Sequence, residues 1–360
     1  MSKRRPLTAS SGAQLAREIR RVDQELVKLM NERARASQQL ARAEGEAVLW
    51  GEDQQVDEAI MTSRGPLDER ALRATFRELV SGCHALVKPI RVAYLGPLYS
   101  YSYLATIERF GSSAELVPVA TITAVFEELN RGQAAFGVVP LENSTDGRVV
   151  DTLGMFARMP VRICGEVQLR IHHNLLAKCD RSDITEVYSK PQALSQCREW
   201  LANHLPNARP VEMTSTAAAA QLAAEKPGAA AVASRLAAAN YGLSFVAENI
   251  EDNPHNITRF AVIGGEVAPR TGRDKTSVMF EISHRPGSLA DAMAIFKREK
   301  LNMTWIESFP MAGGNSEYLF FVELEGHQSD TKVARALELL VKKTVRMEIL
   351  GSYAVGEPID

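Results

Sequence analysis

The sequence has few cysteines, and their spacing excludes most of the roles that cysteine plays. Four occur among 360 residues, at Cys83, Cys164, Cys179 and Cys197. None forms a C-x-x-C pair, and none has a metal-ligand spacing to a histidine. This pattern indicates reduced thiols in a cytoplasmic protein and predicts no metal site.

Long apolar runs and an excess of one charge are absent as well. No run approaches the roughly 20 apolar residues of a membrane-spanning helix, and the net charge is −2. The start, MSKRRPLTASSG, is basic but no apolar stretch follows it, so it does not predict a secretory signal. These features argue against a membrane or a nucleic acid as a partner.

The first part of the chain, about residues 8–89, is predicted to be helical. Apolar residues recur at three- and four-residue steps on one face of a long helix, at Leu15, Ile19, Val22, Leu26 and Leu29. A short helix near residues 54–62 and a third helix after RGPLDER are expected to follow. The third should turn four apolar residues inward, namely Leu72, Phe76, Leu79 and Leu86. These helices predict a bundle that dimerisation could complete.

Strand and helix patterns alternate from residue 90 to residue 267. RVAYL, AELVPV, AAFGVVP and GAAAVA have the composition of buried strands, and helices such as TAVFEELNRG lie between them. This alternation predicts an α/β domain with parallel strands. Residues 274–356 have the order βαββαβ of a ferredoxin-like module, preceded by a polar linker, EVAPRTGRDK. The predicted fold class is therefore multi-domain α and α/β.

Three polar loops are candidate ligand sites: PLENSTDG, YSKPQ and NITRF. Ligands of such folds bind at the carboxyl ends of strands, although ENSTDG also suits an ordinary turn and Ser189 a helix cap. Arg259, beside Thr258 at the start of a core strand, must be ion-paired or bind an anion. His173 shares a strand face with apolar residues, which favours a hydrogen-bonded core histidine over a metal ligand. The residues thus predict an anion-binding cleft without indicating a reaction.

The order of the segments resembles that of prephenate dehydratases. The matching segments are GPLYSYSYLA, VVPLENSTDGRVVDTL, VYSKPQALSQC, TSTAAAA, ANYGLSFVAENIEDNPHNITRF and the terminal βαββαβ unit. The helical start is similar to the AroQ-type chorismate mutase domain that is fused to dehydratases in P-proteins. The resemblance covers about residues 10–355 and implies a two-lobed domain like a type 2 periplasmic binding protein, with the active site between the lobes. A homodimer or homotetramer is expected.

The implied reaction converts prephenate to phenylpyruvate, CO₂ and water in L-phenylalanine biosynthesis. Aromatisation drives it, so the enzyme must hold two carboxylates and assist the departing hydroxyl, with no metal or redox cofactor. The resemblance implies that Thr258 hydrogen-bonds to the leaving oxygen, and that Arg259 holds a carboxylate or the site itself. Asn143 and Glu142 are the other expected catalytic residues. The expected substrate-lining residues are Ser102, Ser144, Ser189, Gln196 and Phe260.

Three positions in these motifs depart from the family's pattern. In GPxGTFSHxA, Tyr99 replaces the glycine and Tyr103 the histidine, and Lys190 replaces the histidine of YSHPQ. Tyrosine is poorly suited to the positive φ that a glycine allows in a turn. Two alternatives follow, namely an aromatic-metabolite sensor without turnover and a dehydratase for a related acid such as arogenate. An inward-pointing Lys190 would disfavour arogenate, because arogenate carries an ammonium group.

The helical region departs further from a chorismate-binding mutase. Three residues keep the positions of pocket residues: Arg33, Asp53 and Asp57. Four replace expected polar or charged groups: Ala16, Glu44, Val56 and Val87. Losing three cations removes contacts worth roughly 1.5–3 kcal/mol each. We therefore expect this domain to have lost much or all mutase activity and to serve dimerisation.

The last unit resembles an ACT domain, which in this family binds phenylalanine at a dimer interface and inhibits the enzyme. L-phenylalanine is therefore the expected effector. The expected effector-binding residues are Gly287, Ser288, Leu289, Glu307 and Ser308. Phe309 replaces the arginine of the usual E-S-R-P motif.

Overall fold

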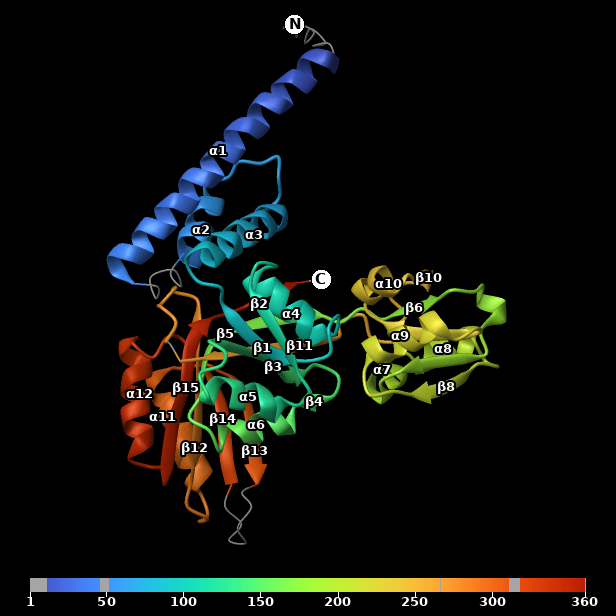
Figure 1. The fold of residues 1–360 in the computed structure, drawn as a ribbon. Coiled ribbons are helices and arrows are strands. Elements are labelled where there is room, and N and C mark those ends of the chain that lie inside the picture. The colour runs from blue at the N-terminus through green and yellow to red at the C-terminus, as the bar shows by residue number, and fades with distance from the viewer. Residues whose placement is uncertain (1–11, 46–51, 266, 311–317, 360) are drawn as a thin grey trace, which may run out of the picture. The chain divides into compact units, whose positions relative to one another are not determined.

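The computed structural model describes residues 12–45, 52–265, 267–310 and 318–359, with the backbone alone at 52–54. The chain divides into two compact units (Figure 1). One comprises Met1–Pro89 with Gly111–Ala114, and the other comprises Ile90–Phe110 with Glu115–Asp360. None of the helices within the described ranges is long and apolar enough to cross a membrane.

The first unit contains the three expected helices, α1 (Gly12–Glu44), α2 (Glu52–Met61) and α3 (Glu69–Val87). Helix α3 begins where the Asp68 carboxylate accepts a hydrogen bond from the backbone N–H of Ala71 at 2.8 Å. The prediction that Leu86 faces inward is wrong, since its side chain is 59% exposed. The buried face of α3 is centred on Val80, and at about 100° per residue Leu86 lies some 120° away from it.

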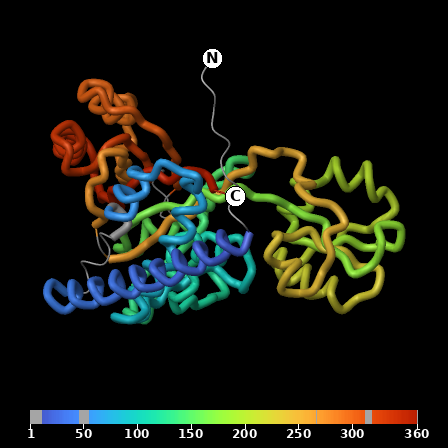
Figure 2. The backbone as a smooth tube through the Cα atoms, turned by 90° about the horizontal axis from the view of Figure 1, so that it is seen from above, coloured from blue at the N-terminus to red at the C-terminus, as the bar shows by residue number. Residues whose placement is uncertain are grey.

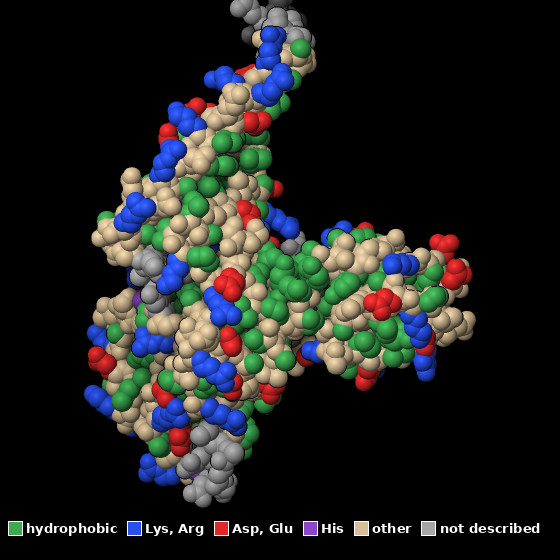
Figure 3. All heavy atoms as spheres, viewed as in Figure 1, with side chains coloured by type: hydrophobic (Ala, Val, Ile, Leu, Met, Phe, Trp, Pro, Cys, Tyr) green, Lys and Arg blue, Asp and Glu red, His purple; other side chains and the backbone are tan. Residues whose placement is uncertain are grey.

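The apolar face of α1 is largely open to solvent in the single chain. Leu15, Ile19, Val22, Leu26 and Leu29 are 45–61% exposed, and apolar side chains gather along this helix (Figure 3). The buried residues of α1 lie only toward its C-terminal end. A contiguous apolar stripe of this kind is typical of an interaction surface.

The second unit is built around a seven-stranded large sheet. Its strands are β1 (Arg91–Leu95), β2 (Glu115–Val119), β3 (Phe136–Asn143), β4 (Gly147–Arg148), β5 (Arg162–Arg170), β11 (Ile257–Gly264) and β16 (Pro358–Ile359). The order along the sheet is β16-β5-β11-β3-β1-β2, with β4 paired to β3. The helices that accompany it are α4 (Tyr101–Phe110), α5 (Ile122–Asn130) and α6 (Val150–Phe156). Strands β1, β2 and β3 are parallel as predicted, whereas β11 is antiparallel to both of its neighbours.

A five-stranded small sheet follows in the sequence. Its strands are β6 (Asn174–Ala177), β7 (Glu186–Ser189), β8 (Arg209–Glu212), β9 (Ala229–Ala233) and β10 (Ser244–Ala247), in the order β10-β6-β9-β7-β8. Its helices are α7 (Pro191–Gln196), α8 (Arg198–His204), α9 (Thr216–Glu225) and α10 (Arg235–Tyr241), with a 3₁₀ turn at Arg181–Asp183.

The chain crosses between the large and small sheets twice, and the two crossings lie side by side (Figure 2). The N–H of Ile171 in the outward crossing donates to Asn256 O at 2.8 Å, and the N–H of Ile250 in the returning one donates to His173 O at 2.8 Å. The expectation that His173 lies within a continuous strand is therefore wrong. Strand β5 ends at Arg170 and β6 begins at Asn174, so His173 stands in the crossing.

The C-terminal sheet is four-stranded and antiparallel, in the order β13-β14-β12-β15. Its elements follow the order βαββαβ: β12 (Asp274–Glu281), α11 (Ser288–Glu299), β13 (Met303–Pro310), β14 (Tyr318–Glu325), α12 (Thr331–Val341) and β15 (Arg346–Ala354). Helices α11 and α12 cover one face (Figure 1) and pack with Val278 and Phe280. Alternate residues such as Met279 and Phe321 join the core of the large sheet instead. The two central strands, β12 and β14, are thus buried on both faces, whereas β13 at the edge alternates with exposed residues.

The predicted polar linker before this sheet is shorter than expected. Asp274 and Lys275 belong to β12 and are only 5% and 6% exposed. The Asp274 carboxylate accepts hydrogen bonds from the N–H groups of Thr271 and Gly272. Polar composition predicted solvent exposure here, but both charged groups are satisfied by partners inside the protein.

The C-terminal sheet approaches the large sheet closely at Gly351 on β15. A Cβ atom at this position would lie 1.9 Å from the carbonyl oxygen of Ile163 on β5. Backbone atoms of two strands cannot yield as a flexible side chain does. Only glycine therefore allows β15 to pack at this distance from β5.

We expect Gly351→Ala to lower the free energy of unfolding by about 3 kcal/mol or more, since overpacking here pushes two backbones apart. Chemical denaturation followed by circular dichroism measures the change. Gly265→Ala is the matched control, because a Cβ there meets nothing within 4 Å, and its effect should stay within about 0.5 kcal/mol. Equal stability of the two variants would contradict the packing described here.

Candidate active site

The pairing of β3 with β11 brings the candidate catalytic residues together. Thr258 lies opposite Asn143, and Arg259 lies opposite Glu142. Thr258 and Arg259 stand at the start of a strand, as predicted. Because β11 is antiparallel to β3, its beginning meets the carboxyl end of β3. The polar residues of PLENSTDG and NITRF therefore meet at one edge of the large sheet.

Neighbouring residues on these strands face opposite sides of the sheet. Asn143 and Thr258 contact each other on one side, and Glu142 and Arg259 form an ion pair on the other. The register shifts between Arg259 and Phe260, so a bulge lies next to both pairs. Such bulges redirect side chains and are frequent beside active sites.

The amide of Asn143 is held in one orientation. Its Oδ1 accepts hydrogen bonds from the backbone N–H groups of Thr145 and Asp146, at 2.9 and 3.0 Å. Because these donors can face only the oxygen, Nδ2 must point to the other side. There it donates to Thr258 Oγ1 at 2.8 Å and to Asn256 Oδ1 at 2.9 Å. All four hydrogen-bonding positions of this 6% exposed amide are used.

Further hydrogen bonds continue this chain of side-chain amides to helix α7, which accompanies the small sheet. Asn256 Nδ2 donates to Gln196 Oε1 at 2.9 Å, and Gln196 Nε2 donates to the carboxylate of Asp146 at 2.6 Å. Gln192 donates to the same carboxylate. This amide chain ties the turn after β3 to helix α7.

His173 joins the amide chain from the crossing segment. Its Nε2 lies 2.9 Å from Gln196 Oε1, an acceptor, so Nε2 carries the hydrogen. Its Nδ1 lies 3.1 Å from the hydroxyl oxygen of Tyr101. The single hydrogen of this hydroxyl is shared between Nδ1 and the carbonyl oxygen of His172, which lies 2.8 Å away. Burial lowers the pKa of His173 despite the hydrogen bond to Gln196 and the nearby Glu251. His173 is thus a neutral, hydrogen-bonded histidine, as expected, although it belongs to this network.

The network leaves Thr258 able to act as a hydrogen-bond donor. Its oxygen accepts from Asn143, and among the described residues none accepts its hydroxyl hydrogen. A threonine oriented in this way can donate to an oxygen on which negative charge develops.

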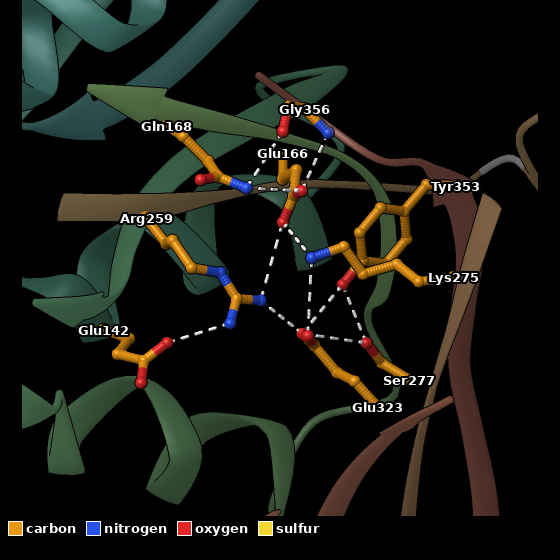
Figure 4. Close-up of polar contacts among 9 residues, drawn as sticks. All are labelled: Glu142, Glu166, Gln168, Arg259, Lys275, Ser277, Glu323, Tyr353 and Gly356. Atoms are coloured by element: carbon orange, nitrogen blue, oxygen red, sulfur yellow. Dashed lines mark hydrogen bonds and ion pairs between the residues drawn. The ribbon is translucent and has the colours of Figure 1, made fainter. Parts of the chain in front are cut away.

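A buried ion cluster occupies the opposite side of the sheet (Figure 4). The Arg259 guanidinium pairs with Glu142 at 2.8 Å, with Glu166 at 3.5 Å and with Glu323 on β14. Lys275 on β12 lies 2.7 Å from Glu166 and 3.4 Å from Glu323. Burial acts to lower the pKa of Arg259, but the charges of Glu323 and Glu166 raise it above its ordinary value. Of the two sequence-based alternatives, the ion-paired arginine is the one found.

The two tyrosines that depart from the family's pattern, Tyr99 and Tyr103, belong to one group of aromatic rings. Tyr99 has a φ of 65°, the positive value for which tyrosine is poorly suited. Its ring contacts those of Tyr103 and Tyr241 edge to face, with centroids 5.5 and 5.9 Å apart. Lys190 is exposed at the N-terminus of α7. The expected capping by Ser189 does not occur, because Lys190 is the N-cap residue and the Ser189 hydroxyl donates to Val232 O at 2.6 Å.

The remaining predicted lining residues are not all gathered around Thr258. Ser144 ties the turn to β11, since its hydroxyl donates to His255 O and accepts from the N–H of Ile257. Ser189 is fully buried in the small sheet, and Ser102 and Phe260 are 6% and 2% exposed. Within the described chain, only Asn143 among the predicted residues has a direct hydrogen bond to the Thr258 side chain. Gln196 is linked to Thr258 through Asn256 and then Asn143.

The predicted mutase remnants lie in the first unit. Asp57 forms an ion pair with Arg73, and Arg33 lies on α1. Asp53 belongs to α2, but its side chain lies outside the described part of the structure.

The predicted effector residues lie on the C-terminal sheet and its first helix. Gly287 has a φ of 88° and directly precedes α11, which begins with Ser288 and Leu289. Glu307 forms a 2.7 Å ion pair with Arg148 on β4, whereas Ser308 is exposed on the other face of β13. Phe309 packs into the core of the large sheet, where a cation would need a partner.

Four polar residues of the site were not predicted: Tyr101, Asp146, His173 and Asn256. Asp146 and Asn256 stand inside the quoted loops, but turn formers are common in loops and gave no reason to select them. His173 was interpreted as a core histidine because its neighbours on the expected strand face are apolar. Tyr101 gave no signal, because its partner lies 72 residues away in the sequence.

Comparisons with known proteins agree with one another. Residues 92–268 match the family model described as prephenate dehydratase. A curated bifunctional chorismate mutase/prephenate dehydratase from Stutzerimonas stutzeri is 41% identical over 346 residues, which covers 92% of this chain and 94% of that protein.

Two solved structures resemble this chain over 74% of its length. A prephenate dehydratase from Arthrobacter aurescens, in complex with L-Phe, is 34% identical with a TM-score of 0.70, and covers 74% of this chain and 90% of its own. GqqA, described as a novel type of quorum quenching acylase, is 29% identical with a TM-score of 0.67, and covers 74% and 98%. One fold therefore carries two described activities, so a mechanism has to be argued from the site.

Proposed function

Since this chain belongs to the family of bifunctional chorismate mutases/prephenate dehydratases, we propose that its dehydratase reaction takes place at Thr258. The chain is a prephenate dehydratase, which forms phenylpyruvate, CO₂ and water from prephenate. The observation that carries the assignment of the site is the fixed amide of Asn143, which occupies the oxygen of Thr258 and leaves its hydrogen to donate.

The chemistry needs little beyond this donor and correct positioning. The bond from the ring to the ring carboxylate breaks, and CO₂ leaves. The electron pair moves through the ring and expels the hydroxide on the opposite carbon as the ring becomes aromatic. Thr258 hydrogen-bonds to this departing oxygen, and hydroxide takes up a proton to become water. Electrostatic stabilisation by a fixed donor typically accounts for about 10²–10³ in rate.

The other predicted catalytic residues receive supporting roles. Glu142 and Arg259 face away from Thr258 and pair with each other, so we assign them to positioning. Gln196 and Asn256, on the amide chain that ends at Asp146, hold the two lobes together around the substrate. Ser144 fixes the turn beside them. Ser102, Ser189 and Phe260 shape the surrounding walls from buried positions.

We expect Thr258→Val to lower kcat for prephenate by at least about 100-fold, because the isosteric side chain cannot donate. Thr258→Ser should keep most of the activity. Phenylpyruvate is followed by its ultraviolet absorbance in alkali. Arogenate is run in parallel, with its product phenylalanine measured by chromatography, because the ammonium group is retained in that reaction.

Full activity of Thr258→Val would exclude the role of the hydroxyl. Turnover of arogenate alone would identify the related-acid alternative, and a wild type with no turnover of either substrate would favour the sensor.

The helical unit is proposed to serve assembly rather than catalysis. Ala16 and Glu44 are exposed in place of expected cations, and Asp57 is occupied by Arg73. The exposed apolar face of α1 supports a homodimer formed through this helix.

We expect no conversion of chorismate above the uncatalysed rate, with the relative from Stutzerimonas stutzeri as the active reference. Light scattering should give the mass of a dimer, and Ile19→Glu should shift it toward monomer. Ile19 is 61% exposed in the single chain, so the substitution should change monomer stability by no more than about 0.5 kcal/mol. Rapid conversion of chorismate would show that the mutase has survived.

The C-terminal module is proposed to be an ACT domain that binds L-phenylalanine. The support is the relative solved in complex with L-Phe, together with the turn at Gly287 that opens helix α11. Ser288, Leu289 and Ser308 are the further proposed contacts. Glu307 is paired with Arg148 and is assigned to coupling with the turn after β3.

We expect L-phenylalanine to bind and to inhibit the dehydratase, as measured by isothermal titration and by rate. Gly287→Ala should weaken binding at least about tenfold, since the turn needs a positive φ. Gly272→Ala is the matched control, because Gly272 has a φ of 94° and equally open surroundings in another loop. Equal loss in both variants would point to general destabilisation, and absence of heat in the wild type would exclude this effector.

A further inference from the structure

The Arg259 guanidinium joins strands of two different sheets. Its Nη1 binds Glu142 on β3 at 2.8 Å, while its Nη2 binds Glu323 on β14 and lies 3.5 Å from Glu166 on β5. Figure 4 shows the guanidinium between these carboxylates. A guanidinium is planar and its nitrogens have fixed directions. Binding both ends therefore fixes its position as well as its charge.

Glu323 is held rigidly by its own sheet. It is 1% exposed and faces Ser277 across the β12–β14 pairing. The hydroxyls of Ser277 and Tyr353 donate to its Oε1 at 3.4 and 3.1 Å, and Lys275 lies 3.4 Å from Oε2. Burial, followed by the charges of Glu323 and Glu166, raises the pKa of Tyr353, which keeps this hydroxyl protonated. The position of the Glu323 carboxylate is thus fixed by residues of its own sheet, and the Arg259 guanidinium pairs with it there.

The cost of this arrangement needs an explanation other than stability. Three of the charged side chains, those of Glu166, Lys275 and Glu323, are no more than 8% exposed. Replacing a buried ion pair by apolar residues of similar volume is often neutral or stabilising. The cluster stands in an otherwise apolar contact between the C-terminal sheet and the large sheet.

The ion cluster around Arg259 also bears on the position of Thr258, the proposed hydrogen-bond donor. Thr258 precedes Arg259 in β11, and the two side chains leave opposite faces of the strand. A change in the position of the Arg259 guanidinium is therefore expected to shift the backbone of β11 that carries Thr258. A displacement of about 1 Å at a catalytic group can cost about 100-fold in rate.

We propose that Glu323 is a positioning residue for the dehydratase reaction, acting through Arg259 on the strand that presents the Thr258 hydroxyl. The C-terminal sheet thereby completes the active site from a face that the substrate does not touch. This inference rests on the proposed function of Thr258.

The test compares Glu323→Gln with Glu325→Gln in the full chain. Glu325 lies on the same strand but is exposed, so its substitution removes the same charge without touching Arg259. We expect Glu323→Gln to lower kcat about tenfold or more, with KM changed less than about twofold, since substrate contacts remain. Glu325→Gln should match the wild type. Wild-type kcat in folded Glu323→Gln, or a rise in KM alone, would overturn the proposal.

A double-mutant cycle tests whether Glu323 acts through Arg259. Arg259→Lys keeps the charge but cannot bind Glu142 and Glu323 together. In this background, Glu323→Gln should lower kcat by less than about twofold further, because residues of one network are not additive. Multiplying effects would overturn the route through Arg259.

Tyr353→Phe covers the case in which Glu323→Gln does not fold. It removes one hydrogen bond to Glu323 and no charge, and kcat should fall about two- to fivefold with an unchanged KM. An unchanged kcat would count against the proposal. Thr258→Val in the same assay separates the two failures. If the wild type turns over and Thr258→Val does not, a fully active Glu323→Gln defeats this inference alone.

Discussion

A guanidinium buried between two sheets must be paired, and this requirement at Arg259 connects most features of the second unit. Its partners come from β3, β5 and β14, so the pairing constrains the strand neighbours of β11 and the docking of the C-terminal sheet. The same strand carries Thr258 on its other face. Polar chemistry on one side of β11 and charge pairing on the other thus share one short piece of backbone.

The local pattern of the sequence predicted many elements of the fold but not their contacts, and it wrongly joined β5 and β6 into one strand through His173. Apolar periodicity predicted the three N-terminal helices, strands β1, β2, β3 and β9, and the βαββαβ order of the last unit. It could not predict that Asp274 and Lys275 are buried, because polarity in a short window indicates solvent. The carboxylates that satisfy Lys275 lie at Glu166 and Glu323, far away in the sequence.

The site was predictable to the extent that its motifs are contiguous. PLENSTDG and NITRF contain Asn143 and Thr258, which the structure pairs directly. The roles of Asn256 and Asp146 depend on which way an amide points, and backbone donors decide that only in the folded chain. Tyr99 is a different case. Because Tyr99 replaces a glycine in a turn, the sequence indicated a positive φ at this position, and the structure has a φ of 65° there.

The close contact at Gly351 has a consequence for how such a chain can change over generations. Here the backbone of β15 rests on that of β5, and the large sheet and C-terminal sheet share one core. A recombination event near residue 270 would have to bring a glycine at this contact and a matching apolar face at once. An exchange that lacked either feature would therefore destabilise the packing of the C-terminal sheet on the large sheet.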